Sequence, residues 1–180
     1  LYRFDNVQAA AEMIKIRYAL LPYLYSEFLK AALQDEMMFE PLAFEFPDDS
    51  MAKQVEDQLL LGKELMIAPV YKQNAQGRYV YLPEEMMLVR MRSCTSYETT
   101  ILPKGHHYIA IALDELVFFI RKQKSIPLAK PAANTEQIDL QTCQLLGYPN
   151  SSYELYADNG DSPRPEDSLH RSTLRNDVSC

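Results

Sequence analysis

The feature that most limits the fold of this sequence is a series of short apolar segments after residue 58, separated by turn residues. Strands are predicted over residues 59–61, 65–70, 77–82, 86–92, 96–102, 106–112, 116–121, 138–146 and 153–157. Segments that recur about every 8–12 residues are typical of an antiparallel sandwich or barrel. We therefore predict a β-sandwich domain over residues 59–160.

Two stretches depart from this pattern. Residues 125–136 are rich in Pro and Ala, so we predict that they cross between strands without forming one. Residues 161–180 are polar, mixed in charge and nearly free of apolar side chains, and we predict a loosely ordered tail there.

An α-helix is predicted over residues 7–33. Apolar side chains recur there at steps of three and four residues, at Ile14, Tyr18, Leu21, Tyr25, Phe28 and Ala32. This period marks one face of a helix, and Asp5 or Asn6 is a suitable N-cap. Pro22 is expected to kink the helix. The opposite face is apolar as well, at Leu20, Leu24 and Leu29, so we expect the helix to be covered on more than one side.

The segment after this helix is short and rich in aromatic side chains. A strand is predicted over residues 37–46, with Pro41 at a sheet edge or at the start of the strand. A short helix is predicted over residues 51–56. The elements within residues 1–58 are too few to form a core alone. The predicted fold class is therefore mainly β with an N-terminal α/β piece.

The amino-acid composition disfavours two classes of function, nucleic-acid binding and membrane insertion. The chain has 25 acidic and 18 basic residues, giving a net charge of −7, which disfavours non-specific binding of nucleic acid. The longest uncharged apolar run, residues 116–120, is far shorter than the roughly 18 residues that a membrane span needs. We therefore predict neither a nucleic-acid partner nor a membrane segment.

Cysteine and histidine are scarce. The three cysteines, Cys94, Cys143 and Cys180, are far apart, and only three histidines accompany them. A disulfide framework and a zinc site are both disfavoured, and a reducing, cytoplasmic location is predicted. We predict no metal and no cofactor. Because a helical pattern follows closely after Leu1, we expect the chain to be a piece of a longer protein.

Several local clusters have both a functional and a structural interpretation. Neighbouring strand residues face opposite sides, so the pair His106-His107 is interpreted as a solvated strand start and not as a metal site. The carboxylates of Asp48-Asp49 and Glu56-Asp57 could serve acid–base chemistry. Because Asp48-Asp49 follows a proline and precedes the predicted short helix, N-capping is the favoured interpretation.

Three further clusters are treated in the same way. Residues 158–161 (Asp-Asn-Gly-Asp) offer calcium ligands but lack the rest of a calcium loop, so a tight turn is favoured. The sequon at residues 150–152 is discounted because the cysteine content argues against secretion. Strand tyrosines could form a platform for stacking sugars, although packing within the sandwich is favoured; they are Tyr79, Tyr81, Tyr97, Tyr108, Tyr148, Tyr153 and Tyr156.

A set of longer motifs carries a resemblance to a known family. In order they are IRYALLPYLY (16–25), EPLAFEFPDD (40–49), EDQLLLG (56–62), LMIAPV (65–70), VYLP (80–83), LDELVFFIR (113–121) with SIPL (125–128), and YELYADNG (153–160). Together they resemble the C-terminal portion of the family 31 glycoside hydrolases. The chain departs from the family pattern in two respects. It has Glu40 where many members carry Arg, and it has no tryptophan.

The resemblance implies a fold and an activity. Residues 1–58 would be the last helix and strand of a (β/α)8 catalytic barrel, followed by the proximal C-terminal β-sandwich. The family hydrolyses α-glycosides with retention, using two aspartates that would lie upstream of Leu1. The implied function is removal of terminal α-linked glucose from oligosaccharides, with this segment bracing the barrel. No catalytic, substrate-binding or metal-binding residue is assigned to this chain, which is predicted to be inactive alone.

The implied partners are an α-linked oligosaccharide, the upstream part of the barrel and a possible second copy in a homo-oligomer. The alternative function, from a different class, is a non-catalytic carbohydrate-binding or scaffold β-sandwich module. A third possible function is an interaction surface, formed by the helix of residues 7–33 with its two apolar faces.

Overall fold

The computed structural model describes residues 6–132, 134–161 and 164–176. Its helices are α1 Val7–Gln34 and α2 Leu42–Glu45, with short 3₁₀ turns η1 Ala52–Gln54, η2 Thr135–Gln137, η3 Leu140–Thr142 and η4 Pro165–Ser168. Its strands are β1 Phe39–Pro41, β2 Leu59–Leu61, β3 Leu65–Ile67, β4 Gly77–Leu82, β5 Met86–Ser93, β6 Ser96–Leu102, β7 Gly105–Ala110, β8 Leu116–Arg121, β9 Ser125–Leu128, β10 Gln144–Gly147, β11 Ser152–Ala157 and β12 His170–Arg175. The predicted mainly β class is confirmed.

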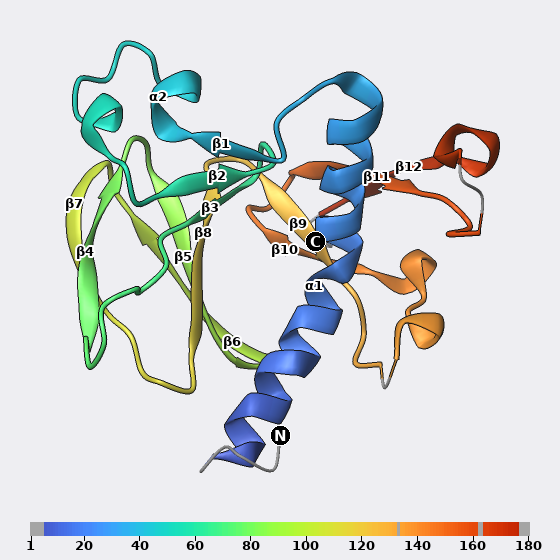
Figure 1. Cartoon of the computed structure of the whole chain (residues 1–180), viewed down its shortest axis with the longest axis horizontal. Coiled ribbons are helices and arrows are strands. Elements are labelled where there is room, and N and C mark those ends of the chain that lie inside the picture. Colours follow the sequence, from blue (N-terminus) through green and yellow to red (C-terminus); the bar gives the residue numbers. More distant parts are fainter. Residues whose placement is uncertain (1–5, 133, 162–163, 177–180) are drawn as a thin grey trace.

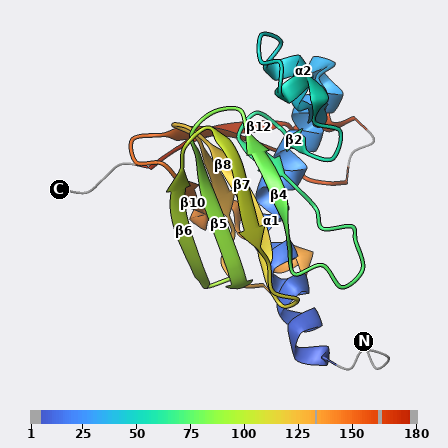
Figure 2. The same ribbon diagram turned by 90° about the vertical axis from the view of Figure 1, so that its left-hand side faces the viewer.

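The strands form one six-stranded sheet and three two-stranded ones. The larger sheet has the order β1-β2-β3-β8-β5-β6, and all its pairings are antiparallel. The pairs β4–β7, β9–β10 and β11–β12 form the smaller sheets. Helix α1 packs against β11, β9 and β5, and the β4–β7 pair lies on the other side of the molecule (Figures 1 and 2). This layered arrangement is that of a sandwich.

The six-stranded sheet has a hydrophobic core on each of its faces. Along β5, Met87, Val89 and Met91 pack toward α1, β9 and β11, whereas Met86 and Leu88 pack toward β4 and β7. Because successive strand residues point to opposite faces, a strand buried on both faces requires an almost continuous apolar run. This explains the apolar sequences of residues 86–91 and 116–120.

Helix α1 confirms the predicted helix and its N-cap. The Asn6 side chain accepts a hydrogen bond from the Ala9 backbone N–H at 3.0 Å, and Asp35 ends the helix in the left-handed conformation. Pro22 lies inside the helix, as predicted. Ile16 and Tyr23 are fully buried, whereas Phe28 is 54 % exposed. Among the described residues, the face with Leu20 and Leu29 is therefore covered, whereas the first predicted face is open at Ile14, Tyr25 and Phe28, so the expected cover on more than one side is not seen.

Two predictions concern the segment between α1 and β2. Of the strand predicted over residues 37–46, only Phe39–Pro41 is present, as β1, because the chain turns into α2 at Leu42. Proline suits the position just before a helix, and it has no N–H to extend a ladder. The short helix predicted over residues 51–56 is confirmed only in part, as the 3₁₀ turn η1 over Ala52–Gln54. Strand β1, which precedes residue 58, pairs with β2, which follows it.

Three other predictions are wrong in part. Residues 125–128 form the buried strand β9 instead of a crossing, and within residues 138–146 only the last three join a strand, β10. The predicted tail contains η4 and the strand β12, which pairs with β11 from Ser152↔Arg175 to Ala157↔His170. Polar side chains suit an exposed edge strand, so composition concealed it. Residues 162–163 and 177–180 of the tail lie outside the described residues.

Candidate functional site

The carboxylate of Asp49 caps a turn and joins an ion pair. Its Oδ1 accepts hydrogen bonds from the backbone N–H groups of Met51 (3.0 Å) and Ala52 (3.2 Å), which confirms the capping interpretation. Its Oδ2 accepts from the Tyr81 hydroxyl at 2.7 Å and from Lys104 Nζ at 2.6 Å. The hydrogen bonds from Lys104 and Tyr81 hold the pKa of Asp49 well below its usual range.

The second predicted carboxylate cluster is also occupied by partners. Asp57 Oδ2 lies 2.5 Å from the guanidinium of Arg78 and accepts from the Tyr71 hydroxyl at 3.3 Å. Asp48 and Glu56 are exposed. Asp49 and Asp57 are each neutralised by a different cation, so this arrangement does not suit paired acid–base chemistry.

The histidine pair behaves as the strand pattern predicts. His106 lies opposite Tyr81, with ring centroids 4.9 Å apart, and His107 lies opposite Val80 on the other face. His107 Nε2 contacts the Pro103 carbonyl at 2.8 Å. Across residues 6–132, 134–161 and 164–176, no group of three or more His, Cys, Asp or Glu side chains is arranged to hold a metal ion.

The Asp-Asn-Gly-Asp segment is a turn, as favoured. Asp158 Oδ1 accepts from the backbone N–H of Gly160 and Asn159 Oδ1 accepts from that of Asp161, both at 3.1 Å. Gly160 adopts a φ of 70°, which suits glycine. The sequon residue Asn150 is exposed at another tight turn.

Of the seven tyrosines that could form a platform, three are buried, three are exposed and one is half-buried. Tyr81, Tyr153 and Tyr156 are buried, so they belong to packing and not to a platform. Tyr79 and Tyr108 are 72 % and 56 % exposed, and they face each other across β4 and β7 with ring centroids 5.2 Å apart. Tyr97 is also exposed, on β6, and Tyr148 is half-buried.

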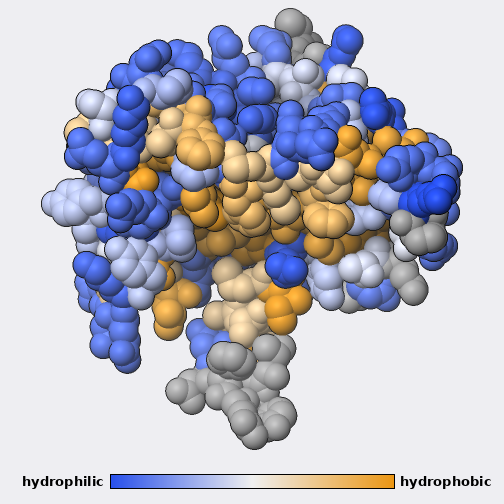
Figure 3. Space-filling view, turned by 45° about the horizontal axis from the view of Figure 1, so that its top comes forward, coloured by the Kyte–Doolittle hydropathy of each residue, from blue (hydrophilic) through white to orange (hydrophobic). Residues whose placement is uncertain are grey.

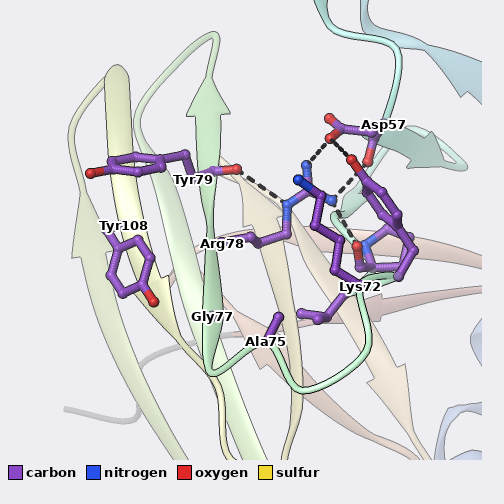
Figure 4. Close-up of a pocket in the computed structure, with 10 residues that line it drawn as sticks. Asp57, Lys72, Ala75, Gly77, Arg78, Tyr79 and Tyr108 are labelled. Carbon is purple, nitrogen blue, oxygen red and sulfur yellow. Dashed lines mark hydrogen bonds and ion pairs between the residues drawn. The ribbon is translucent and has the colours of Figure 1, made fainter.

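A surface pocket lies beside this exposed pair. Its volume is about 330 Å³, and Figure 4 shows Tyr79 and Tyr108 at one side of β4 and Arg78 reaching toward Asp57 at the other. Among the polar and aromatic members of the pocket, Tyr71, Lys72 and Arg78 were not singled out from the sequence. The strand predicted over residues 77–82 implies that Arg78 and Tyr79 point to opposite faces, but no local pattern indicates that Asp57 is the partner of Arg78.

Arg78 is the best-anchored side chain of the pocket. Its guanidinium donates to the carbonyl oxygens of Pro69 (2.7 Å), Asp57 (3.2 Å) and Tyr79 (3.2 Å), in addition to the Asp57 carboxylate. It also lies 5.7 Å from the centroid of the Tyr71 ring. Because arginine stays protonated in proteins, this guanidinium does not transfer protons. Its bonds fix the wall of the pocket that Pro69 and Asp57 form.

The sequence is similar to glycoside hydrolases of one family. The family model described as "Glycosyl hydrolase family 31 C-terminal domain" matches residues 35–126. Lysosomal alpha-glucosidase of Mus musculus is 30 % identical over 89 % of this chain, and alpha-glucosidase of Aspergillus oryzae is 30 % identical over 97 %. The chain spans about a fifth of the length of these relatives, 19 % of each.

Solved structures share the fold. A GH31 dextranase of Flavobacterium johnsoniae, complexed with glucose, covers 99 % of this chain with a TM-score of 0.75 and 24 % identity, over 22 % of its own length. The glucosidase II alpha subunit in its Tris-bound form also covers 99 %, with a TM-score of 0.79 and 20 % identity, over 20 % of its own length.

Proposed function

This chain belongs to glycosyl hydrolase family 31, and from that premise we propose that it is the C-terminal part of a retaining α-glycosidase. The match of residues 35–126 to the family's C-terminal domain carries this proposal. The proposed reaction is the removal of terminal α-linked glucose from oligosaccharides, and relatives named alpha-glucosidase support that choice.

We propose that residues 1–58 complete a (β/α)8 barrel and that residues 59–160 form the sandwich that braces it. An exposed apolar face supports this division. Phe28 on α1, Phe39 on β1 and Phe44 on α2 are 54 %, 49 % and 62 % exposed. Figure 3, which brings this end of the molecule forward, shows apolar side chains gathered across it. Such a surface is typical of a face that another part of a protein covers, and the proposed cover is the upstream barrel.

Catalysis would come from two upstream aspartates, one as nucleophile and one as acid and base. The carboxylates after α2 in this chain have structural roles, since Asp49 caps η1 and Asp57 pairs with Arg78. We therefore assign no catalytic residue here, and we expect the 180-residue chain to hydrolyse nothing by itself.

An activity assay of the complete gene product that contains this chain tests the proposal. We expect glucose release from maltose or isomaltose, with the α-anomer appearing first by NMR. The isolated 180-residue chain is the matched control and should be inactive. Hydrolysis by the isolated chain, or none by the complete product on any α-glucoside, would overturn the proposal.

A second experiment tests the bracing role. In the complete product, replacing Phe28 and Phe44 by Asp should lower the thermal midpoint and the activity together, because charges would enter a covered apolar interface. Tyr97→Asp is the control, since Tyr97 is 44 % exposed on β6, at the opposite edge of the six-stranded sheet from β1. Equal losses in both variants would contradict the bracing role.

Location and assembly are also proposals. The free cysteines Cys94 and Cys143 support a reducing compartment and hence the cytoplasm, although some relatives are named lysosomal. Cell fractionation decides between these compartments, and sedimentation of the complete product tests for a homo-oligomer. Among the described residues, no helix is both long and apolar enough to cross a membrane.

A further inference from the structure

We propose that the outer face of the β4–β7 pair, together with the loop that carries Tyr71, is a binding groove for a neutral oligosaccharide. Two adjoining pockets form this groove, and they share Asp57, Tyr71 and Tyr79. One has a volume of about 330 Å³ and extends to Tyr108, and the other has about 460 Å³ and extends to His106. Both volumes lie in the range of about 300–1,000 Å³ that small-molecule sites occupy.

The floor of the groove carries three exposed rings, those of Tyr79, His106 and Tyr108, and the buried Tyr81 packs against His106. Because strand side chains alternate, Tyr79 and Tyr81 of β4 project to the same face as their cross-strand partners Tyr108 and His106 of β7. The pair Tyr79–Tyr108 meets edge to face at 5.2 Å, and the pair Tyr81–His106 lies at 4.9 Å. The rings therefore hold one another in place.

Three tyrosine rings of the groove are more exposed than packing alone explains. Tyr71, Tyr79 and Tyr108 are 66 %, 72 % and 56 % exposed, although all three line the same pocket. A tyrosine presents an apolar ring face and a polar hydroxyl. A pyranose has the matching character, with an apolar face of C–H groups and a rim of hydroxyls, so it can stack on the ring and hydrogen-bond beside it.

The polar groups of the groove are already ordered. The Arg78 side chain is only 11 % exposed and is held by the Asp57 carboxylate at 2.5 Å. The Asp57 side chain is 40 % exposed, so it can still accept a hydrogen bond from a ligand hydroxyl. Side chains that are fixed before binding lose little entropy on binding, which favours the affinity of a ligand that forms only a few hydrogen bonds.

The charge balance of the groove also favours a neutral ligand. Arg78 and Asp57 neutralise each other, and the other charged side chains that line the two pockets are Lys72 and Glu56, one of each sign. A phosphate or nucleic-acid ligand requires an excess of positive charge, and a cationic ligand requires the reverse. The choice of an α-linked glucan rests on the proposed function, whereas the choice of a neutral sugar does not.

Titration of the 180-residue chain with isomaltotriose, maltotriose and the β-linked cellotriose tests the inference, followed by NMR shifts or calorimetry. We expect saturable binding of at least one α-linked trisaccharide. Tyr79→Ala and Tyr108→Ala should each weaken it by about tenfold or more, the loss equivalent to about 1.4 kcal/mol. Tyr97→Ala is the matched control, an exposed strand tyrosine outside both pockets, and should bind as well as the unmodified chain.

Each outcome supports or overturns the inference. Absence of saturable binding by all three sugars overturns it, as does an equal loss in Tyr97→Ala. Tighter binding of a proline-rich peptide at the same residues also overturns it. Equal binding of cellotriose supports the sugar groove and overturns only the α-linked choice. Because binding is measured on a chain that we expect to be inactive, failure of the hydrolysis assay leaves this result unaffected, and the reverse also holds.

Discussion

Two regions of the molecule contain the same combination of one carboxylate, one tyrosine and one lysine. In the buried triad, Glu27 accepts from the Tyr153 hydroxyl at 2.6 Å and from Lys30 Nζ at 2.7 Å. The open triad has nearly the same distances, 2.7 Å and 2.6 Å; its members are Asp49, Tyr81 and Lys104.

Burial separates the two triads. The Glu27 and Lys30 side chains are 5 % and 14 % exposed, whereas that of Lys104 in the open triad is 57 % exposed. The buried triad also has a second acid beside it, Glu64, whose pKa is raised by burial and by the charge of Glu27. In the open triad the neighbouring cation lowers the pKa of Asp49. The Asp49 side chain is itself only 12 % exposed, so the two triads differ chiefly at the lysine, which solvent reaches in the open triad and hardly in the buried one. Equal geometry therefore predicts unequal energies.

The largest expected effect is that of Glu27→Ala. It leaves the ammonium of Lys30 and the hydroxyl of Tyr153 buried without their partner, and breaking such a pair costs about 3–5 kcal/mol. Urea denaturation of the 180-residue chain measures the loss. Glu12→Ala is the control, since Glu12 and Lys15 have the same sequence spacing and the same 2.7 Å distance at an exposed site. A comparable loss in the control would show that burial is not what distinguishes the triads.

Gly62→Ala tests the buried triad by placing a methyl group against Glu27. Gly62 has a φ of 64°, and an added Cβ would overlap the Glu27 carboxylate and lie 2.7 Å from the Tyr23 hydroxyl oxygen. The left-handed conformation alone costs a non-glycine residue about 1–2 kcal/mol, so we expect a loss of about 2–3 kcal/mol. Gly160→Ala is the control, with a φ of 70° and no described atom within 4 Å of the added Cβ. Equal losses at the two glycines would mean that Glu27 is not held in place.

Sequence patterns predicted the parts of the fold that local rules decide. The helix α1, with its Asn6 cap, follows from periodicity, and β4, β6 and β8 have the predicted bounds because turn residues flank them. The strand β9 and the polar strand β12 were missed because each depends on a partner strand, β10 and β11 respectively. No local pattern records such a partner.

The candidate site divides in the same way. The N-cap at Asp49 and the opposed faces of the histidine pair follow from sequence position and strand alternation. The pocket around Arg78 does not, because Asp57 and Pro69 reach it from segments separated by up to 21 residues. The buried Glu27 was likewise hidden, since its tyrosine partner lies 126 residues away.

Glu64→Gln tests how the stability of the region around the buried triad depends on pH. Because the folded pKa of Glu64 is raised, the folded state binds more protons than the unfolded state between the two pKa values, and stability falls as pH rises through that window. At neutral pH we expect the variant to be more stable than the unmodified chain, on the order of 1 kcal/mol, since a buried charge is removed. The difference should vanish near the ordinary pKa of Glu, about 4.3. Denaturation at pH 7 and pH 4 measures it, and a variant less stable at pH 7 would show that the 3.5 Å pair with Lys124 outweighs burial.

Asp49→Asn in the open triad should have the smallest effect and the opposite pH dependence. Asn is as good an N-cap as Asp, so the variant keeps the bonds to Met51 and Ala52. It loses the ion pair with Lys104, and because an amide nitrogen replaces Oδ2, the Tyr81 hydroxyl must accept a hydrogen bond there instead of donating one. An ion pair this exposed contributes about 0.2–1 kcal/mol, and salt screens it. Because the folded pKa of Asp49 is lowered, its contribution is present above the unfolded value of about 3.9 and is lost as pH falls below it. We therefore expect the variant to be slightly less stable at pH 7 in low salt and equal to the unmodified chain in about 1 M salt, where the Debye length is about 3 Å. A loss that persists in high salt would mean that the open triad is screened no better than the buried one, and burial would then fail to explain their difference.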